Sequence, residues 1–253
     1  MYKIPANTLF MGKRLIYMPE CHSTNDEASK LIGAGGEVNG TIMITDKQVA
    51  GKGQRGNRWE AAPAKNLTFS IVITPTRFSA INQAYLTMVV SLGIHDWLSR
   101  TLQQKKVYIK WPNDVLVADR KVCGILIENH ITGNFISHAI VGIGLNINQE
   151  TFQAPLAVSL KMLTGKAFNL QNCFEQVVAC IESRYLMLEQ NEFVLIKAEY
   201  LERLYWIGEP HYFISAGKRF SGIITGTDES GRLVIDVNGT SKTFDVKEVS
   251  FVR

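Results

Sequence analysis

The chain has 253 residues, of which 46% are hydrophobic and 20% are charged, and its 27 basic and 23 acidic residues leave a net charge of +4. This length allows one large domain, or one large and one small, with an ample core. The composition is ordinary for a soluble globular protein, and so mild a charge does not by itself argue for nucleic acid. No apolar run reaches the length of a membrane span, and no secretory stretch follows the N-terminus.

The cysteines and histidines exclude several classes of site. Four cysteines without C-x-x-C spacing fit a reduced, cytoplasmic setting. The five histidines show no metal-binding spacing, so we expect no zinc site. No Walker A sequence occurs, so any bound nucleotide must be held by a different binding motif.

The first half of the chain is predicted to form a helix, two consecutive strands and a second helix. Thr24 and Glu27 have the spacing of a capping box, which predicts a helix from Thr24 to about Ile32. Strands are expected over 41–45 and 67–73. Apolar residues then recur at helical spacing over 81–102.

The second half is predicted to contain an antiparallel run of strands, then helices, then a small β-rich unit. The strands are expected at 107–111, 115–117, 122–128 and 135–148, and the helices at about 172–190 and 193–205. From about Gly208 short strands alternate with turns, and Asn238-Gly239 is a strong hairpin signal. We therefore expect a main domain over 1–206 and a small β-barrel over 207–253, packed on the main domain.

The most informative segment runs from Gly51 to Trp59, with the sequence GKGQRGNRW. It matches G-x-G-x-x-G, but the dinucleotide-binding fingerprint also needs a helix that opens inside the glycine run. Here Pro63 follows, and then the strand over 67–73. The segment is therefore predicted to be a loop between strands whose cations hold an anion. A solvated hairpin tip is the alternative, and the dense local positive charge favours the anion.

Four segments together resemble the biotin–protein ligases (biotin–[acetyl-CoA-carboxylase] ligases). They are Ser23-Thr24-Asn25, Gln48 through Trp59, Lys110 through Asp114 with Arg120 through Ile125, and Gly142 through Asn146. Their order and spacing match over nearly the whole chain. The resemblance implies an α+β fold: a mixed, mostly antiparallel sheet with flanking helices, related to class II aminoacyl-tRNA synthetases, as in the biotin/lipoate ligase catalytic domain. A small C-terminal SH3-like β-barrel completes it, so 1–206 would be the catalytic domain that binds biotin and ATP.

The resemblance implies a two-step, ATP-dependent attachment of biotin to a lysine. ATP, with Mg²⁺, and biotin give biotinyl-5′-AMP and pyrophosphate, and the carrier lysine then displaces AMP. The expected partner is a biotin carboxyl carrier protein or domain of acetyl-CoA carboxylase, with neither DNA nor a membrane involved. Some family members carry a DNA-binding domain ahead of this region. Because this chain starts about twenty residues before Ser23, we expect no repressor role, and either a monomer or a homodimer.

The resemblance also assigns the catalytic residues. Lys121 would lie beside the biotin carboxylate and the transferring phosphate, where fixed positive charge lets two anions meet. Arg55 and Lys52 would contact phosphate and the adenylate in a loop that is mobile when empty. Asp114 would lie near the α-phosphate or the incoming amine. An exposed hairpin lysine is the alternative for Lys121, and turn chemistry is the alternative for Asp114.

The substrate-binding assignments follow in the same way. Biotin and its adenylate would be bound by Ser23, Thr24, Asn25, Gln48, Gly51, Lys52, Gly53, Gln54, Gly124 and Asn146, and no metal-ligating residue is expected. Helix capping is the alternative for Ser23 and Thr24, and a strand-end cap for Asn146. The family commonly has arginine where this chain has Lys52 and Gln54. Lys52 keeps the charge without the bidentate fork, and Gln54 loses the charge.

Three other functions compete with this interpretation. A lipoate or octanoate transferase has a related fold, but the basic loop and the barrel tail favour biotin. A nucleic-acid-binding module would need a stronger charge and interleaved aromatic and basic residues in the tail. A scaffold without catalysis would not need Lys121 and the loop glycines, which this chain keeps.

Overall fold

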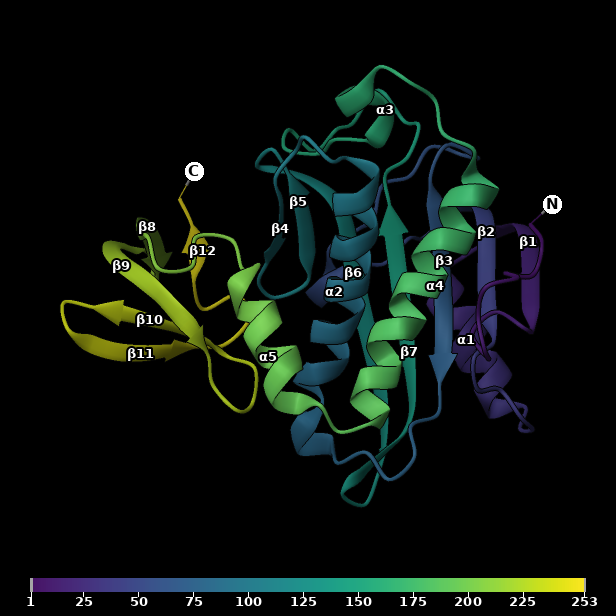
Figure 1. Ribbon diagram of the computed structural model, residues 1–253, viewed down its shortest axis with the longest axis horizontal. Helices are drawn as coiled ribbons and strands as arrows, with labels where there is room; N and C mark the ends of the chain where they lie inside the picture. Colours follow the sequence, from purple (N-terminus) through teal and green to yellow (C-terminus); the bar gives the residue numbers. More distant parts are fainter. Residues whose placement is uncertain (1, 253) are drawn as a thin grey trace.

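The computed structural model describes residues 2–252, except for the side chain of Arg55, and contains two sheets (Figure 1). The larger sheet has the order β1-β2-β3-β7-β6-β5-β4. Its strands are β1 (Leu15–Cys21), β2 (Ile42–Gln48), β3 (Leu67–Ile73), β4 (Val107–Lys110), β5 (Asp114–Val117), β6 (Arg120–Thr132) and β7 (Phe135–Leu145). Only β1 and β2 pair in parallel, and the other neighbours are antiparallel. The predicted mixed, mostly antiparallel sheet is confirmed.

Helices cover both faces of this sheet. The helices are α1 (Thr24–Gly33), α2 (Ala84–Thr101), α3 (Leu160–Thr164), α4 (Leu170–Glu189) and α5 (Phe193–Glu202). Side chains alternate between the faces of a strand, so on β2 Ile42 and Ile44 join the large core under α2 and α4, whereas Met43 joins a smaller one under α1. In α2, Gly93 lets the backbone of α4 approach closely, since a Cβ there would lie 2.6 Å from the Cα of Ile181.

The C-terminal unit is a five-stranded antiparallel sheet with the order β11-β10-β9-β8-β12. Its strands are β8 (Pro210–Ser215), β9 (Lys218–Thr227), β10 (Leu233–Val237), β11 (Thr240–Phe244) and β12 (Ser250–Phe251). Asn238 and Gly239 form the predicted hairpin turn between β10 and β11, and both have positive φ. The Trp111 indole N–H donates to the carbonyl of Gly231 at 2.9 Å, which joins this unit to the main sheet. The SH3-like closure and the boundary between residues 206 and 207 stay predictions.

Some elements differ from those predicted. β1 and the short α3 were not predicted, because Pro19 and flanking polar residues obscure any alternation in β1. An edge strand tolerates proline, since one side of its backbone needs no partner.

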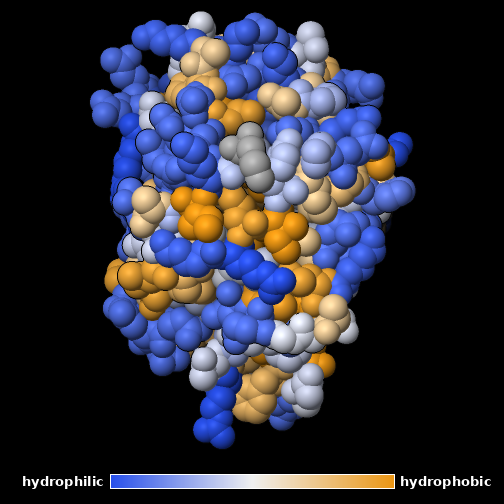
Figure 2. Space-filling view, turned by 90° about the vertical axis from the view of Figure 1, so that its right-hand side faces the viewer, coloured by the Kyte–Doolittle hydropathy of each residue, from blue (hydrophilic) through white to orange (hydrophobic). Residues whose placement is uncertain are grey.

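Hydrophobic side chains gather in a band on the side of the molecule where this edge lies (Figure 2). The long helix starts at Ala84, after a 3-10 turn over Ala80–Asn82, and none of the helices within residues 2–252 is long and apolar enough to span a membrane.

Candidate active site

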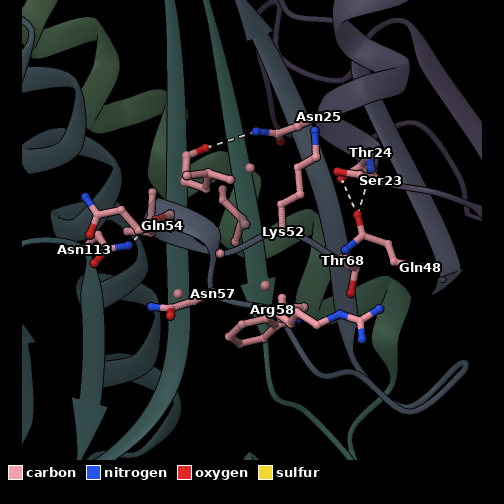
Figure 3. A pocket seen from close by; sticks show the side chains of 18 of the residues that line it. Ser23, Thr24, Asn25, Gln48, Lys52, Gln54, Asn57, Arg58, Thr68 and Asn113 are labelled. Atoms are coloured by element: carbon pink, nitrogen blue, oxygen red, sulfur yellow. Dashed lines mark hydrogen bonds between the residues drawn. The ribbon is translucent and has the colours of Figure 1, made fainter. Parts of the chain in front are cut away.

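A cavity of about 140 Å³ lies over the central strands of the large sheet, between the start of α1 and the loop from Gly51 to Trp59 (Figure 3). We call residues 51–59 the flap. The cavity brings together ten of the thirteen predicted site residues: Ser23, Thr24, Asn25, Gln48, Lys52, Gly53, Gln54, Asp114, Lys121 and Gly124. Residues from five regions of the chain therefore meet in one place.

One side of the cavity is formed by four polar residues, Ser23, Thr24, Asn25 and Gln48, which we call the polar wall, and the side chains of the last three are hydrogen-bonded within the protein. The Gln48 Oε1 atom accepts from the backbone N–H of Thr24 at 2.7 Å and lies 3.2 Å from the Thr24 hydroxyl (Figure 3). Ser23, Thr24 and Asn25 are only 2–3% exposed. Since the polar wall is already bonded within the protein, it is organised before any ligand arrives.

The predicted capping box is wrong. The N-cap of α1 is Ser23, not Thr24, and its side chain makes no capping hydrogen bond. The Thr24 hydroxyl is directed to Gln48 and Ser70 instead. A hydroxyl used inside the cavity is not available to cap the helix, which explains the departure from the usual motif.

Glycines form the floor of the cavity. Gly124 and Gly144 are paired across β6 and β7, and the Trp59 ring lies against both, so a Cβ at Gly144 would overlap the indole. A Cβ at Gly142 would overlap the amide oxygen of Asn25. These glycines are therefore needed for close approach rather than for a special backbone angle.

Another part of the cavity lining holds an ion pair between Lys121 Nζ and Asp114 Oδ1 at 2.6 Å. The two side chains are 35% and 18% exposed. Lys121 Nζ also lies 5.6 Å from the centre of the Trp59 ring. The backbone of Lys121 is fixed on both sides, donating to Leu156 at 2.7 Å and accepting from Val158 at 2.9 Å. An ammonium has three hydrogens, so Lys121 keeps donors for a ligand while it holds Asp114.

The flap is held less firmly than the polar wall. Lys52 Nζ pairs with the carboxylate of Asp26 on α1, and this hydrogen bond raises the pKa of Lys52. The Lys52 side chain is 45% exposed. Inside the flap, the Gly53 N–H donates to the Asn57 carbonyl at 2.7 Å. The Gln54 side chain lies beside Asn113 at the far end of the cavity (Figure 3).

Two predicted site residues, Gly51 and Asn146, are not among the described residues that line the cavity. Gly51 is buried, and a Cβ there would lie 2.6 Å from the Trp59 carbonyl oxygen. Asn146 is 2% exposed, and its Oδ1 atom has no hydrogen-bond partner among the described residues. The side chain of Arg55 lies outside the described part of the chain. The roles assigned to all thirteen residues stay predictions.

Several residues at the cavity were not among the thirteen site residues assigned from the sequence. Trp59, Asn57, Arg58, Thr68 and Gly144 line it, and Ser70 lies directly behind the polar wall. Gly144 carried a signal, because Gly142 and Gly144 are two residues apart in a strand and so share a face. No three His, Cys, Asp or Glu side chains within the described residues are grouped so that they could hold a metal ion.

Comparison with known proteins identifies the family. Residues 17–146 match the model of the biotin/lipoate A/B protein ligase family. A biotin–[acetyl-CoA-carboxylase] ligase from Paracoccus denitrificans is 30% identical over 236 residues, which cover 90% of this chain and 97% of that protein. This chain belongs to the biotin/lipoate A/B protein ligase family.

Further relatives are similar over most of their length. The bifunctional ligase/repressor BirA of Bacillus subtilis is 27% identical over 91% of this chain and 72% of its own length. A solved structure of the biotin protein ligase from Aquifex aeolicus, in complex with biotin and ATP, has 26% identity and a TM-score of 0.78, covering 95% of this chain and 99% of that one. The resemblance, and the predicted mixed sheet with flanking helices followed by a small β unit, are thereby confirmed.

Proposed function

We propose that this chain is a biotin–[acetyl-CoA-carboxylase] ligase. It activates biotin with ATP to give biotinyl-5′-AMP and pyrophosphate, and it then transfers biotin to a lysine of a carrier protein, releasing AMP. One observation carries the proposal: a preformed polar wall and a Lys121–Asp114 pair occupy one cavity. Two relatives support the proposal. The Paracoccus denitrificans protein is named a biotin–[acetyl-CoA-carboxylase] ligase, and the Aquifex aeolicus ligase was solved with biotin and ATP bound.

The two ends of the cavity suit the two ends of biotin. Biotin has a cyclic urea that needs donors and acceptors at fixed places, and an aliphatic tail that ends in a carboxylate. The polar wall offers amide and hydroxyl groups to the urea. The Trp59 ring over the glycine floor offers a flat apolar surface to the rest of the molecule. The tail then leads towards Lys121.

In the first step, a biotin carboxylate oxygen attacks the α-phosphorus of ATP, and pyrophosphate leaves. Both reactants are anions, so the barrier falls if fixed positive charge lies between them. Lys121 supplies that charge from a backbone held by hydrogen bonds to Leu156 and Val158. Lys52 and Arg55 of the flap add to it as they close over the phosphates, and Asn146 binds the adenine.

In the second step, the neutral amine of the carrier lysine attacks the carbonyl carbon of the mixed anhydride, and AMP leaves. The amine must lose a proton, and Asp114 is the carboxylate placed to accept or orient it. Its contact with Lys121 holds the Asp114 carboxylate near the reacting atoms. The closed flap shields the anhydride from water until the carrier arrives.

Mg²⁺ enters this scheme with ATP as part of the substrate, held mainly by phosphate oxygens and water. Of the described residues that line the cavity, Asp114 is the one carboxylate, and it already pairs with Lys121. The donor set therefore fits a nucleotide-bound ion better than a protein-held one. We place the reaction in the cytoplasm, where carrier and ATP meet, with no DNA or membrane involved and the enzyme acting as a monomer or homodimer.

The test is mass spectrometry of a biotin carboxyl carrier domain after incubation with the protein, Mg-ATP and biotin. The expected result is the mass gain of one biotinyl group, absent when the carrier's acceptor lysine is changed to arginine. A parallel incubation with lipoate should give no gain. Modification by lipoate but not by biotin, or by neither acid, would overturn the proposal.

A further inference from the structure

Behind the polar wall, Ser70 of β3 connects two of its members. Ser70 is fully buried, and its Oγ atom lies 2.6 Å from the Thr24 hydroxyl oxygen and 2.6 Å from the amide oxygen of Asn25. Ser70 itself is not among the residues that line the cavity, whereas Thr24 and Asn25 are. Ser70 can therefore act on a ligand only through these neighbours.

The amide of Asn25 has one possible orientation. Its nitrogen lies 2.5 Å from the Glu128 carboxylate and 3.4 Å from the carbonyl oxygen of Leu126, and both of these groups can only accept hydrogen bonds. The two amide hydrogens of Asn25 are thus directed to Glu128 and Leu126. The Asn25 oxygen consequently faces Ser70, over the space that Gly142 leaves open.

This orientation decides which hydroxyl donates. A serine hydroxyl has one hydrogen, and an amide oxygen can only accept, so the hydrogen of Ser70 is directed to Asn25. The contact between Ser70 and Thr24 must then run the other way, with Thr24 donating. The competing acceptor, Gln48 Oε1, is farther from the Thr24 hydroxyl at 3.2 Å and already accepts the Thr24 backbone N–H at 2.7 Å.

With its hydrogen directed to Ser70, the Thr24 oxygen presents only lone pairs to the cavity. The Gln48 amide is oriented by its oxygen, so its NH₂ group is the part left to donate to a ligand. The wall therefore offers a hydroxyl acceptor at Thr24 and an amide donor at Gln48. A cyclic urea carries N–H donors beside a carbonyl acceptor, which is the complementary arrangement.

We propose that Ser70 is a positioning residue that makes Thr24 a hydrogen-bond acceptor for a ureido N–H of biotin. This inference rests on the proposed function and adds to it a determinant of specificity. Chemically, the wall distinguishes a ring N–H from a ring oxygen of the same size, because an oxygen would place lone pair against lone pair at Thr24.

The test uses cyclic carbamate analogues of biotin, in which one or the other ureido N–H is replaced by a ring oxygen. Adenylation of biotin and of both analogues is measured by pyrophosphate exchange with the wild-type protein and with Ser70→Ala. Without Ser70, the Thr24 hydroxyl turns and donates to the ring oxygen. We expect KM for biotin to rise about tenfold, kcat to stay within about twofold, and discrimination against one carbamate to fall about tenfold.

Ser91→Ala is the matched control. Ser91 is also fully buried, and its hydroxyl has no partner among the described residues, but it belongs to α2 beyond the sheet. This substitution should leave KM for biotin and both discrimination ratios unchanged. If Ser70→Ala raises KM for biotin and for both carbamates by the same factor, the loss is one of packing, and the inference is overturned.

Glu128→Gln provides a second route that does not depend on a core substitution, because Glu128 is an exposed residue. A neutral amide at position 128 can donate as well as accept, so it removes the constraint on the Asn25 amide. Discrimination against the same carbamate should fall, by less than in Ser70→Ala, and unchanged discrimination in Glu128→Gln would overturn the inference. If the wild-type protein shows no exchange with biotin at all, the proposed function fails.

Discussion

The polar wall and the flap line the same cavity but are built in opposite ways. In the wall, Thr24 and Asn25 are 3% exposed and bonded to Ser70 behind them. In the flap, the Lys52 side chain is 45% exposed and held by one ion pair to Asp26. The wall is hydrogen-bonded to the sheet, whereas the flap touches the sheet through the Trp59 ring and its backbone is bonded to itself, for example from Gly53 to Asn57.

This difference separates recognition from activation. A neutral, rigid ligand group is recognised best by a site that is organised beforehand, because little entropy is then lost on binding. A reactive anhydride needs a cover that opens for substrates and closes on the intermediate. We therefore expect substitutions in the wall to change KM for biotin, and substitutions in the flap to change handling of the nucleotide and the adenylate.

The largest effect is expected at Lys121, which lies in the same cavity beside the Trp59 ring of the flap. Lys121→Ala should lower the rate of adenylation about 10²–10³-fold, since it removes a preorganised stabilising charge. Biotin-dependent pyrophosphate exchange measures this rate. Lys161→Ala is the control, because Lys161 also forms a 2.6 Å ion pair, with Glu150, outside the cavity. Near wild-type exchange in Lys121→Ala would contradict the assigned role.

The next effect tests the rigidity of the wall. In Gly142→Ala, the new methyl group would displace the Asn25 amide. Overpacking of this kind costs about 1–3 kcal/mol, so KM for biotin should rise about 10–100-fold while the KM for ATP changes little. Gly33→Ala serves as the control, since a Cβ there meets nothing within 4 Å. An unchanged KM for biotin would show that the polar wall can rearrange without loss of biotin binding, which contradicts its proposed rigidity.

A smaller effect is expected from the flap glycine. In Gly53→Ser, the added Cβ would lie 3.2 Å from the Asn57 carbonyl oxygen, which is tight enough to disturb the turn that joins Gly53 to Asn57. Release of biotinyl-AMP into solution should become about tenfold faster, equivalent to about 1.4 kcal/mol. Chromatography of the free adenylate during turnover without carrier measures this release. Gly33→Ser is the control, since a Cβ there meets nothing within 4 Å. If Gly53→Ser releases biotinyl-AMP no faster than Gly33→Ser does, the flap does not shield the intermediate.

The smallest effect concerns the ion pair that holds Lys52. Asp26→Asn should free the ammonium for phosphate and lower the Kd for ATP up to about fivefold, since an exposed pair is worth about 0–1 kcal/mol. Calorimetric titration with Mg-ATP in the presence of biotin measures it. Glu27→Gln is the matched control, because Glu27 pairs with Lys30 on the same helix at 2.8 Å. Weaker ATP binding in Asp26→Asn would contradict this prediction, because it would mean that Asp26 holds Lys52 in the position from which it binds ATP.

The sequence predicted the parts of the fold that carry strong local patterns. The strand over 67–73 and the Asn238-Gly239 hairpin were confirmed because β-branched runs and type I′ turns have local signatures. β1 was missed because its position at the sheet edge tolerates Pro19. The capping box failed because the Thr24 hydroxyl has tertiary partners, which no local spacing reveals.

The candidate site likewise contains residues that local sequence motifs predicted and residues that depend on tertiary contacts. Short motifs located Lys121, Asp114 and the polar wall, since each motif is contiguous in the chain. Ser70 and Glu128 had no such signal, because they reach Asn25 from 45 and 103 residues away. Trp59 entered the sequence analysis only as the end of the basic segment, and the pairing of Gly124 with Gly144 shows why its ring lies over the floor of the cavity.

The central claim is that a rigid wall recognises biotin while a basic flap closes over the activated product. A crystal structure with biotin and Mg-ATP, or with biotinyl-AMP, tests it most directly. The account predicts the urea against Thr24 and Gln48, the carboxyl end beside Lys121, and residues 51–59 folded over the phosphate. Ligands bound elsewhere, with the flap turned away from them, would contradict it.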